Sequence, residues 1–225
     1  FLPRAAERVG SITMAVSEKL SDLLRRMPGV TDFVNRWEDI PKDSEAYATL
    51  SDLPLLFGGE EPDMVAPACY LPIEEPRKAA WRARLDGHAG GHLKVGLCWS
   101  GRTGHLHNRL RSLRLATLAS LAGLSGVSFF SLQFDEQKRQ VADWPQGQAP
   151  LVDLSAELEG FDETAHCLAA LDLVITIDTV TAHLGAAVGT PTWTLLLRIA
   201  DWRWLESRED SPWYPTMRLF RQDEQ

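Results

Sequence analysis

A polar turn that follows a buried apolar run carries residues suited to binding an anion. The run Leu173–Ile177 is rich in β-branched residues, and Asp178-Thr179 follows it at the start of a helix rich in Ala and Gly. Thr179 or Thr181 can cap that helix, whose first turn then directs unpaired N–H groups and the positive end of its dipole toward a ligand. The sequence therefore predicts a phosphate or pyrophosphate site here. A threonine-capped turn that only stabilises the fold would explain the same residues.

His183 falls in the first turn of the same predicted helix. Its ring can donate a hydrogen bond to a phosphate oxygen, or it can simply cover the helix end. Because the positive helix end disfavours an imidazolium, we expect a neutral ring as long as no anion is bound.

A second polar loop follows the apolar run Leu93–Trp99. Ser100 and Gly101 offer backbone N–H groups there, and arginines further along offer forked donors that match a phosphate. No acidic residue lies between Asp86 and Asp135, although the protein as a whole is acidic. The basic side chains of this stretch are His88, His92, Lys94, Arg102, His105, His107, Arg109, Arg111 and Arg114. We expect Arg102, Arg109 and Arg111 to bind a small anionic ligand; a surface cluster balanced by acids elsewhere would have the same composition.

Other segments can contribute to the same ligand. Gln133 ends the apolar run that starts at Val127, and it can read a base or a sugar hydroxyl or simply lie on the surface. Leu154 and Phe161 can line a base, and Phe161 can equally be a core residue. Four of the eight tryptophans fall late in the chain, at Trp193, Trp202, Trp204 and Trp213. They can cover a sugar ring or form a rigid aromatic core, and Asp201 is the carboxylate of interest beside them.

The elements that must position these loops alternate regularly along the chain. Apolar runs predict strands at residues 93–99, 127–133, 150–154, 173–177 and 192–197. Segments with helical spacing lie between them, at 113–124, from 134 to about 142, at 162–172 and at 181–189. This alternation predicts an α/β fold with a parallel sheet covered on both faces. The polar loops would then lie at the carboxyl ends of the strands, where such sheets bind ligands.

The first ninety residues contain shorter elements. The pattern predicts strands at 11–16 and 30–35, a helix from Ser17 to about residue 27, a Pro- and Gly-rich loop at 51–72 and a helix at 76–85. The glycine-rich stretch Asp86–His92 predicts a turn and a domain boundary. We therefore expect one domain over residues 1–90 and a second over residues 91–225.

The composition is that of an ordinary globular chain. Its 225 residues are 44% hydrophobic and 24% charged, with a net charge of −8, which argues against a nucleic-acid partner. No apolar stretch reaches the length of roughly 18 residues that a membrane span needs. The spacing of Cys69, Cys98 and Cys167 fits no zinc pattern, so we expect free thiols in a reducing compartment and no metal. Because the sequence starts without Met, we expect it to be a piece of a longer chain.

Several of these segments together resemble a known family. The segments "VGLCWSG", "HNRLRSL", "FFSLQ", "LVITIDTVTAHLGAAVGTPTW" and "DWRWLESREDSPWYPTMRLFRQ" look like the C-terminal module of bacterial TPR-containing proteins in glycosyltransferase family 9, the heptosyltransferase-like group. The resemblance implies a GT-B-like fold of two Rossmann-like domains, the N-terminal one incomplete. It also implies that the donor diphosphate binds at Asp178, Thr179, Val180, Thr181 and His183. The family motif commonly has Gly where this sequence has Val180.

The resemblance implies transfer of a sugar from a nucleotide-diphosphate sugar to an acceptor hydroxyl, without a metal or another cofactor. The acceptor would be a saccharide, a lipid-linked molecule or a protein, and the catalytic base and first strand would precede Phe1. The last strand and a crossing helix would follow Gln225, and a fused TPR region would lie outside this chain. The expected location is the cytoplasm, including the inner face of the membrane.

Two other interpretations stay open. A catalytically degenerate module that binds a nucleotide or a partner without turnover would have the same features, and Val180 favours it. A GT-B-like epimerase or phosphorylase would need a dedicated catalytic carboxylate or a lysine for pyridoxal phosphate, and no lysine falls in such a motif.

Overall fold

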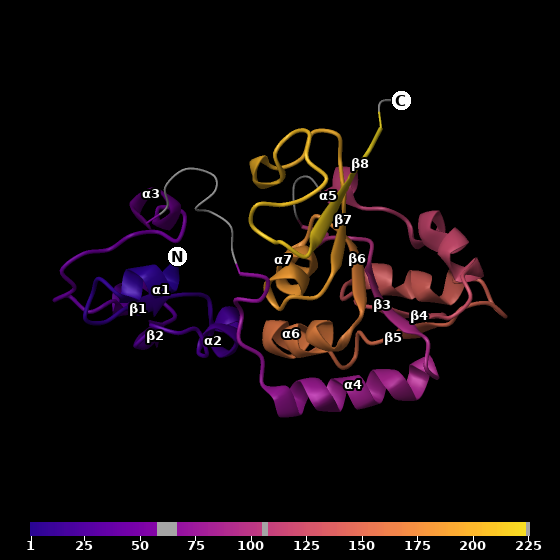
Figure 1. Ribbon diagram of the computed structural model, residues 1–225, viewed down its shortest axis with the longest axis horizontal. Coiled ribbons are helices and arrows are strands. Elements are labelled where there is room, and N and C mark those ends of the chain that lie inside the picture. The colour runs from indigo at the N-terminus through magenta and orange to yellow at the C-terminus, as the bar shows by residue number, and fades with distance from the viewer. Residues whose placement is uncertain (58–66, 105–107, 224–225) are drawn as a thin grey trace.

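The computed structural model describes residues 1–57, 67–104 and 108–223. Its centre is a six-stranded parallel sheet in the order β5-β4-β3-β6-β7-β8 (Figure 1). The strands are β3 (Leu93–Cys98), β4 (Val127–Ser131), β5 (Leu151–Asp153), β6 (Leu173–Ile177), β7 (Thr192–Leu196) and β8 (Met217–Arg221). The predicted α/β class with a parallel sheet is therefore confirmed. The strand β8, which the sequence pattern did not predict, pairs in parallel with β7 along its whole length.

Both faces of this sheet are covered, because alternate side chains of each strand point to opposite sides. Phe130 and Val174 point into a core cluster shared with α4 (Glu75–Ala89) and α6 (Gly160–Ala170). Their chain neighbours Phe129 and Ile175 point into a second cluster, which holds Leu115 and Trp144. That second face is covered by 3-10 helices, η3 (Leu115–Gly123) and η4 (Glu136–Asp143), where the sequence predicted ordinary helices. A short helix, α7 (Val180–Ala187), contacts β6 and β7.

The predicted glycine-rich turn at Asp86–His92 is wrong over its first half. The helix α4 continues to Ala89 and ends at Gly90, which takes a left-handed conformation with φ of 59°. Trp81, Leu85 and Ala89 are all buried at a spacing of four residues, so the apolar stripe of α4 extends past Gly87.

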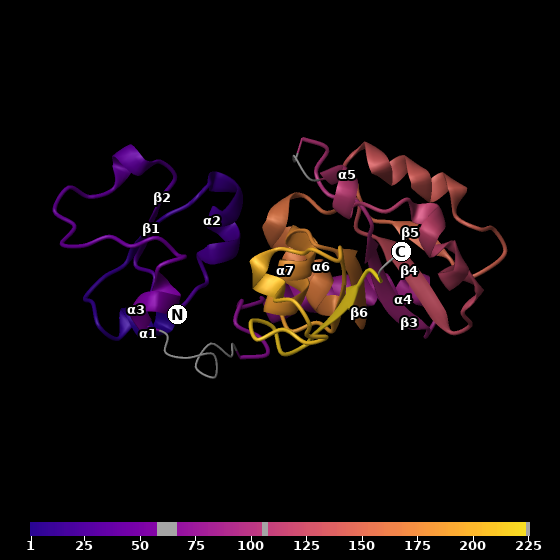
Figure 2. The ribbon, with the colours of Figure 1, turned by 90° about the horizontal axis from the view of Figure 1, so that it is seen from above.

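The N-terminal part contains a small parallel sheet. The strands β1 (Thr13–Ala15) and β2 (Asp32–Val34) pair in parallel and are connected through α2 (Glu18–Leu24), which confirms both predicted strands. The remaining elements of this part are α1 (Leu2–Ala6), η1 (Trp37–Asp39) and α3 (Leu53–Phe57). This part lies to one side of the large sheet, and Figure 2 shows α2 as its element next to α6 and α7. Leu23 of α2 is buried in the same cluster as α6, so apolar packing joins the two parts.

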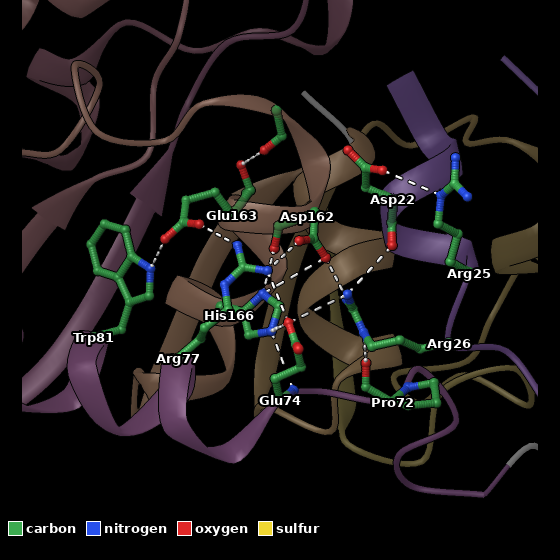
Figure 3. Close-up of polar contacts among 12 residues, drawn as sticks. Asp22, Arg25, Arg26, Pro72, Glu74, Arg77, Trp81, Asp162, Glu163 and His166 are labelled. Carbon is green, nitrogen blue, oxygen red and sulfur yellow. Dashed lines mark hydrogen bonds and ion pairs between the residues drawn. The ribbon is translucent and has the colours of Figure 1, made fainter. Parts of the chain in front are cut away.

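A network of charged side chains reinforces this junction (Figure 3). Asp162, in the first turn of α6, accepts hydrogen bonds from Arg26 after α2 and from Arg77 of α4, the latter at 2.5 Å. Arg77 also binds Glu163, whose other oxygen accepts from Trp81 Nε1 at 2.5 Å. Burial raises the pKa of Asp162, but the bonds from Arg26 and Arg77 outweigh burial and hold that pKa below its ordinary value. The carboxylate therefore stays charged and pairs both arginines.

The two edges of the large sheet are short or covered. The edge strand β5 has only three residues. Along β8, Asp210 forms an antiparallel bridge with Arg218, and Leu219 N donates to Glu209 O at 2.7 Å. Within the described residues, no helix is long and apolar enough to cross a membrane.

Candidate functional site

The strand order places a topological switch point between β3 and β6. The chain leaves β3 toward β4 on one side of the sheet and leaves β6 toward β7 on the other. This is the strand order of a Rossmann fold, in which the loops on either side of the switch point diverge and leave a crevice that binds ligands. Ser100 and Gly101 follow β3, and Asp178 and Thr179 follow β6. The fold therefore brings the two predicted anion-binding loops to neighbouring positions at the carboxyl edge of the sheet.

Arg111 connects these two loops directly. It ends the short helix α5 (Asn108–Arg111), and its Nη1 donates to the Asp178 carbonyl oxygen at 2.6 Å. The Nε of Arg111 is buried and has no hydrogen-bond partner among the described residues. Its guanidinium lies so close to Gly101 that a Cβ added there would be 2.8 Å from Nη2. A fixed positive charge with an unused buried donor thus lies at the switch point.

The backbone N–H groups of Ser100 and Gly101 are already bonded within the protein. Gln133 Oε1 accepts from Ser100 N at 3.0 Å, and Gln133 Nε2 donates to Ser100 O at 2.9 Å. Gly101 N donates to Ser112 Oγ at 3.2 Å. The expectation that these N–H groups are open to an anion is therefore wrong for this conformation. Gln133 is 3% exposed and holds the end of β3 to the end of β4, instead of facing a base or a sugar.

The helix α7 begins at Val180, earlier than the sequence predicts. Thr179 occupies the N-cap position, but no described side chain accepts a hydrogen bond from the first turn of α7. The Thr179 hydroxyl instead lies 3.3 Å from the Thr176 hydroxyl, and Thr181 is buried inside the helix. The predicted threonine cap is thus wrong, which leaves the first N–H groups of α7 without a capping side chain. Val180 is 42% exposed at this end of the helix.

His183 is held by an aromatic cluster that the sequence did not predict. Its Nδ1 lies 2.9 Å from Tyr214 Oη, its ring stacks on Trp204 at 5.2 Å, and its Nε2 lies 4.0 Å from Asp178 Oδ1. Burial lowers the pKa of His183 and outweighs the opposite effect of Asp178. The lowered pKa favours the neutral ring that the sequence predicts, but its cause is burial and not the helix end. Tyr214 lies 31 residues away, so nothing in the local spacing indicated this contact.

The tryptophan-rich tail has one tryptophan in a core and another exposed to solvent. Trp204 is 1% exposed and packs with Leu196 and Met217 in a small core against α7. Trp202 is 66% exposed. Asp201 caps the 3-10 helix η5 (Trp202–Trp204), because its Oδ1 accepts from Arg203 N at 3.1 Å.

The remaining predicted residues lie partly in the core and partly on the surface. Leu154 is fully buried, so its side chain faces the core and not a base. Phe161 is partly buried and packs against the same core cluster, and its predicted contact with a base stays a prediction. Arg102, on the loop after β3, and Arg109, in α5, are both exposed. His105 and His107 lie outside the described residues. Among the residues that the structure describes, no group of three His, Cys, Asp or Glu side chains is placed to hold a metal.

Two positively charged features lie at the switch point. The charge of Arg111 and the positive end of α7 act together there, and helix ends of this kind attract phosphate groups. Asp178, with its side chain 23% exposed, supplies one opposing charge and can accept a hydrogen bond from a ligand hydroxyl.

Comparison with known proteins bears on the fold of the chain. No family model matches the chain. Protein FlbA of Caulobacter vibrioides is 31% identical over 161 residues, which are 67% of this chain, and the chain spans only 25% of the length of FlbA.

Solved structures match nearly the whole chain. The ADP-heptose LPS heptosyltransferase II of E. coli aligns with a TM-score of 0.64 at 15% identity, over 97% of this chain and 84% of that protein. A glycosyl transferase family 9 structure from Veillonella parvula aligns with a TM-score of 0.52 at 13% identity, over 96% and 57% of the two chains. At these identities the likeness shows the fold, and we conclude that the chain has the GT-B-like α/β fold of these glycosyltransferases.

Proposed function

We propose that this chain binds a nucleotide-diphosphate sugar at the crevice between β3 and β6 and takes part in transferring the sugar to an acceptor hydroxyl. The position of Arg111 carries the proposal, because its guanidinium joins both switch-point loops and keeps a buried Nε without a partner. The first turn of α7 has no capping side chain, so the positive end of this helix can also attract the diphosphate. The likeness of the fold to heptosyltransferase II and to a family 9 glycosyltransferase supports the same function.

In the proposed reaction, the acceptor oxygen attacks the anomeric carbon as the bond to the diphosphate oxygen breaks. Negative charge develops on the leaving diphosphate, and Arg111 with the α7 N-terminus stabilises it by electrostatics instead of a metal ion. The acceptor proton passes to a base that we do not assign to any residue here. We place the nucleotide within residues 91–225 and the acceptor side within residues 1–90, in a larger bacterial protein that carries a TPR region. The acceptor is a saccharide, a lipid-linked molecule or a protein.

Binding and turnover measured on the full-length protein test the proposal. UDP-, GDP- and ADP-sugars are titrated by calorimetry, and donor hydrolysis or transfer is followed by release of the nucleotide. Replacing Arg111→Gln should weaken binding of the nucleotide by about 10- to 100-fold, because it removes a charge-assisted contact. Arg114→Gln is the matched control, since Arg114 is exposed in the same basic stretch, and it should bind like wild type. Equal affinities for the two variants, or no binding of any nucleotide sugar by the wild type, would refute the proposal.

A second candidate is a degenerate module that binds a nucleotide or a partner without turnover. Two observations favour it: Arg111 Nη1 is already bonded to the Asp178 carbonyl, and the Ser100 and Gly101 N–H groups are satisfied internally. Saturable binding of a nucleotide without hydrolysis or transfer would identify this function.

A further inference from the structure

The turn at residues 201–204 lies against the N-terminal end of α7. Trp204 stacks on His183, which lies in the first turns of α7, and Tyr214 packs at an angle against both rings. In Figure 1 the loop that follows β7 lies at the same end of the sheet as α5, which carries Arg111. The buried side of this turn is thus anchored beside the proposed diphosphate crevice.

The other side of the turn presents an exposed aromatic ring. Trp202 is 66% exposed although it precedes the fully buried Trp204 by only two residues. Most of the Trp202 surface remains in water, so its burial adds little to folding. The contacts of Trp202 therefore fix its orientation more than they bury it.

Two neighbouring side chains, Arg203 and Trp213, contact the Trp202 ring. The Arg203 guanidinium lies 5.0 Å from the Trp202 ring centroid, and Arg203 Nη1 pairs with Asp201 Oδ1 at 2.6 Å. Trp213 meets the Trp202 ring at 89° with centroids 6.2 Å apart, and its own Nε1 donates to Arg203 O at 2.9 Å. Because Arg203 and Trp213 are themselves anchored, the exposed indole is held in one orientation.

The backbone at the end of this turn is strained. Leu205 has φ of 55°, and among the described residues it is the one non-glycine residue with positive φ. A bulky residue in this conformation costs about 1 kcal/mol or more, and such strain persists where the surrounding structure enforces it. The strain and the ring contacts together show that the fold maintains this turn at some cost while leaving Trp202 exposed.

Building on the proposed function, we infer that the turn Asp201–Arg203 is the subsite for the sugar ring of the donor, with the Trp202 indole stacked on the sugar. A pyranose presents an apolar face of C–H groups, which packs well on an aromatic face, and a rim of hydroxyls. The Asp201 carboxylate and the Arg203 guanidinium are 38% and 48% exposed, so they supply an acceptor and donors for that rim. A sugar on a diphosphate held at the start of α7 is next to this turn, because Trp204 of the turn touches His183.

The test compares each nucleoside diphosphate with its hexose conjugate on the full-length protein, by calorimetry with UDP, GDP and ADP. We expect wild type to bind one conjugate more tightly than the bare nucleotide. Trp202→Ala should reduce that gain by about 2- to 10-fold while affinity for the bare nucleotide stays unchanged. Trp202→Phe should keep most of the gain, because it retains an aromatic face.

Trp37→Ala is the matched control. Trp37 is 67% exposed and also meets another ring, Tyr47, at a right angle, but it lies in the N-terminal part. Trp37→Ala should leave the affinity for the bare nucleotide and the affinity for its hexose conjugate unchanged. If the nucleotides bind but the conjugates gain nothing, or the gain survives in Trp202→Ala, the sugar subsite is refuted while the proposed function stands. If no nucleotide binds to the wild type, the proposed function itself fails, and this inference fails with it.

Discussion

Replacing Asp162→Asn should destabilise the protein well beyond what an ordinary surface ion pair contributes. The Asp162 side chain is 17% exposed and accepts hydrogen bonds from Arg26, which is 23% exposed, and from Arg77. Each charge-assisted bond contributes about 1.5–3 kcal/mol, and the amide can still accept one of the two bonds. Glu74 and Glu163 remain near Arg77 and offset part of its lost charge pairing. We therefore expect a loss of about 2–3 kcal/mol.

Thermal unfolding provides the assay. For a chain of this size the expected loss corresponds to a fall in the unfolding midpoint of about 5–10 °C. The matched control is Glu136→Gln, which breaks an exposed pair with Arg139 at 2.7 Å and should cost at most about 0.5 kcal/mol. Hydrogen exchange in α2 should also accelerate in the Asp162 variant, because Arg26 anchors the segment that follows α2.

The pH dependence gives a separate test of the same network. Because the folded state holds the pKa of Asp162 below its ordinary value, its contribution is complete above the unfolded-state pKa of about 4. The contribution is lost as the pH falls through the lower folded-state pKa. Wild type should therefore lose stability more steeply than Asp162→Asn below about pH 4. Equal midpoints for the Asp162 and Glu136 variants, or identical acid profiles for wild type and Asp162→Asn, would refute this reasoning.

Two further predictions concern the crevice. Gly101→Ala should cost about 1–3 kcal/mol in urea unfolding, because its Cβ would lie 2.5 Å from Asn108 Oδ1 and would displace Arg111. Gly87→Ala, where the added Cβ meets open space on α4, should instead raise the free energy of unfolding by about 0.5–1 kcal/mol. If Gly101→Ala also stabilises the protein, the close packing at Gly101 is contradicted. His183 should titrate below 6.5 by NMR, so that wild type loses stability as the pH falls from 6.5 toward that lower pKa. His183→Gln should remove this loss, and an ordinary His183 pKa would contradict its burial.

The sheet was largely predictable because its strands are apolar and β-branched on both faces. Leu173–Ile177 and Leu93–Cys98 are found where the runs predicted them. The edge strand β8 escaped prediction because Met217–Arg221 mixes Arg with apolar residues and follows a long irregular loop. The end of α4 could have been found, since Trp81, Leu85 and Ala89 continue one helical stripe across Gly87.

The candidate site was predictable in its loops but not in its contacts. Strand order decides which loops meet, and the sequence alone indicated only that both follow parallel strands. That Arg111, and not its neighbours, reaches the Asp178 carbonyl depends on the missing Cβ of Gly101 and on tertiary packing. Gln133 was misread because a polar residue at a strand end fits a ligand contact as well as a bond between neighbouring strand ends.

The short length of β5 and the bridge along β8 limit the tendency of this chain to aggregate at high concentration. An open edge with unpaired N–H and C=O groups recruits strands from other molecules and promotes aggregation. The antiparallel bridge from Asp210 to Arg218 occupies the outer side of β8, and β5 at the opposite edge is too short to template much pairing. We therefore expect removal of the bridging segment around Glu209 and Asp210 to expose β8 and to promote edge-to-edge association between molecules.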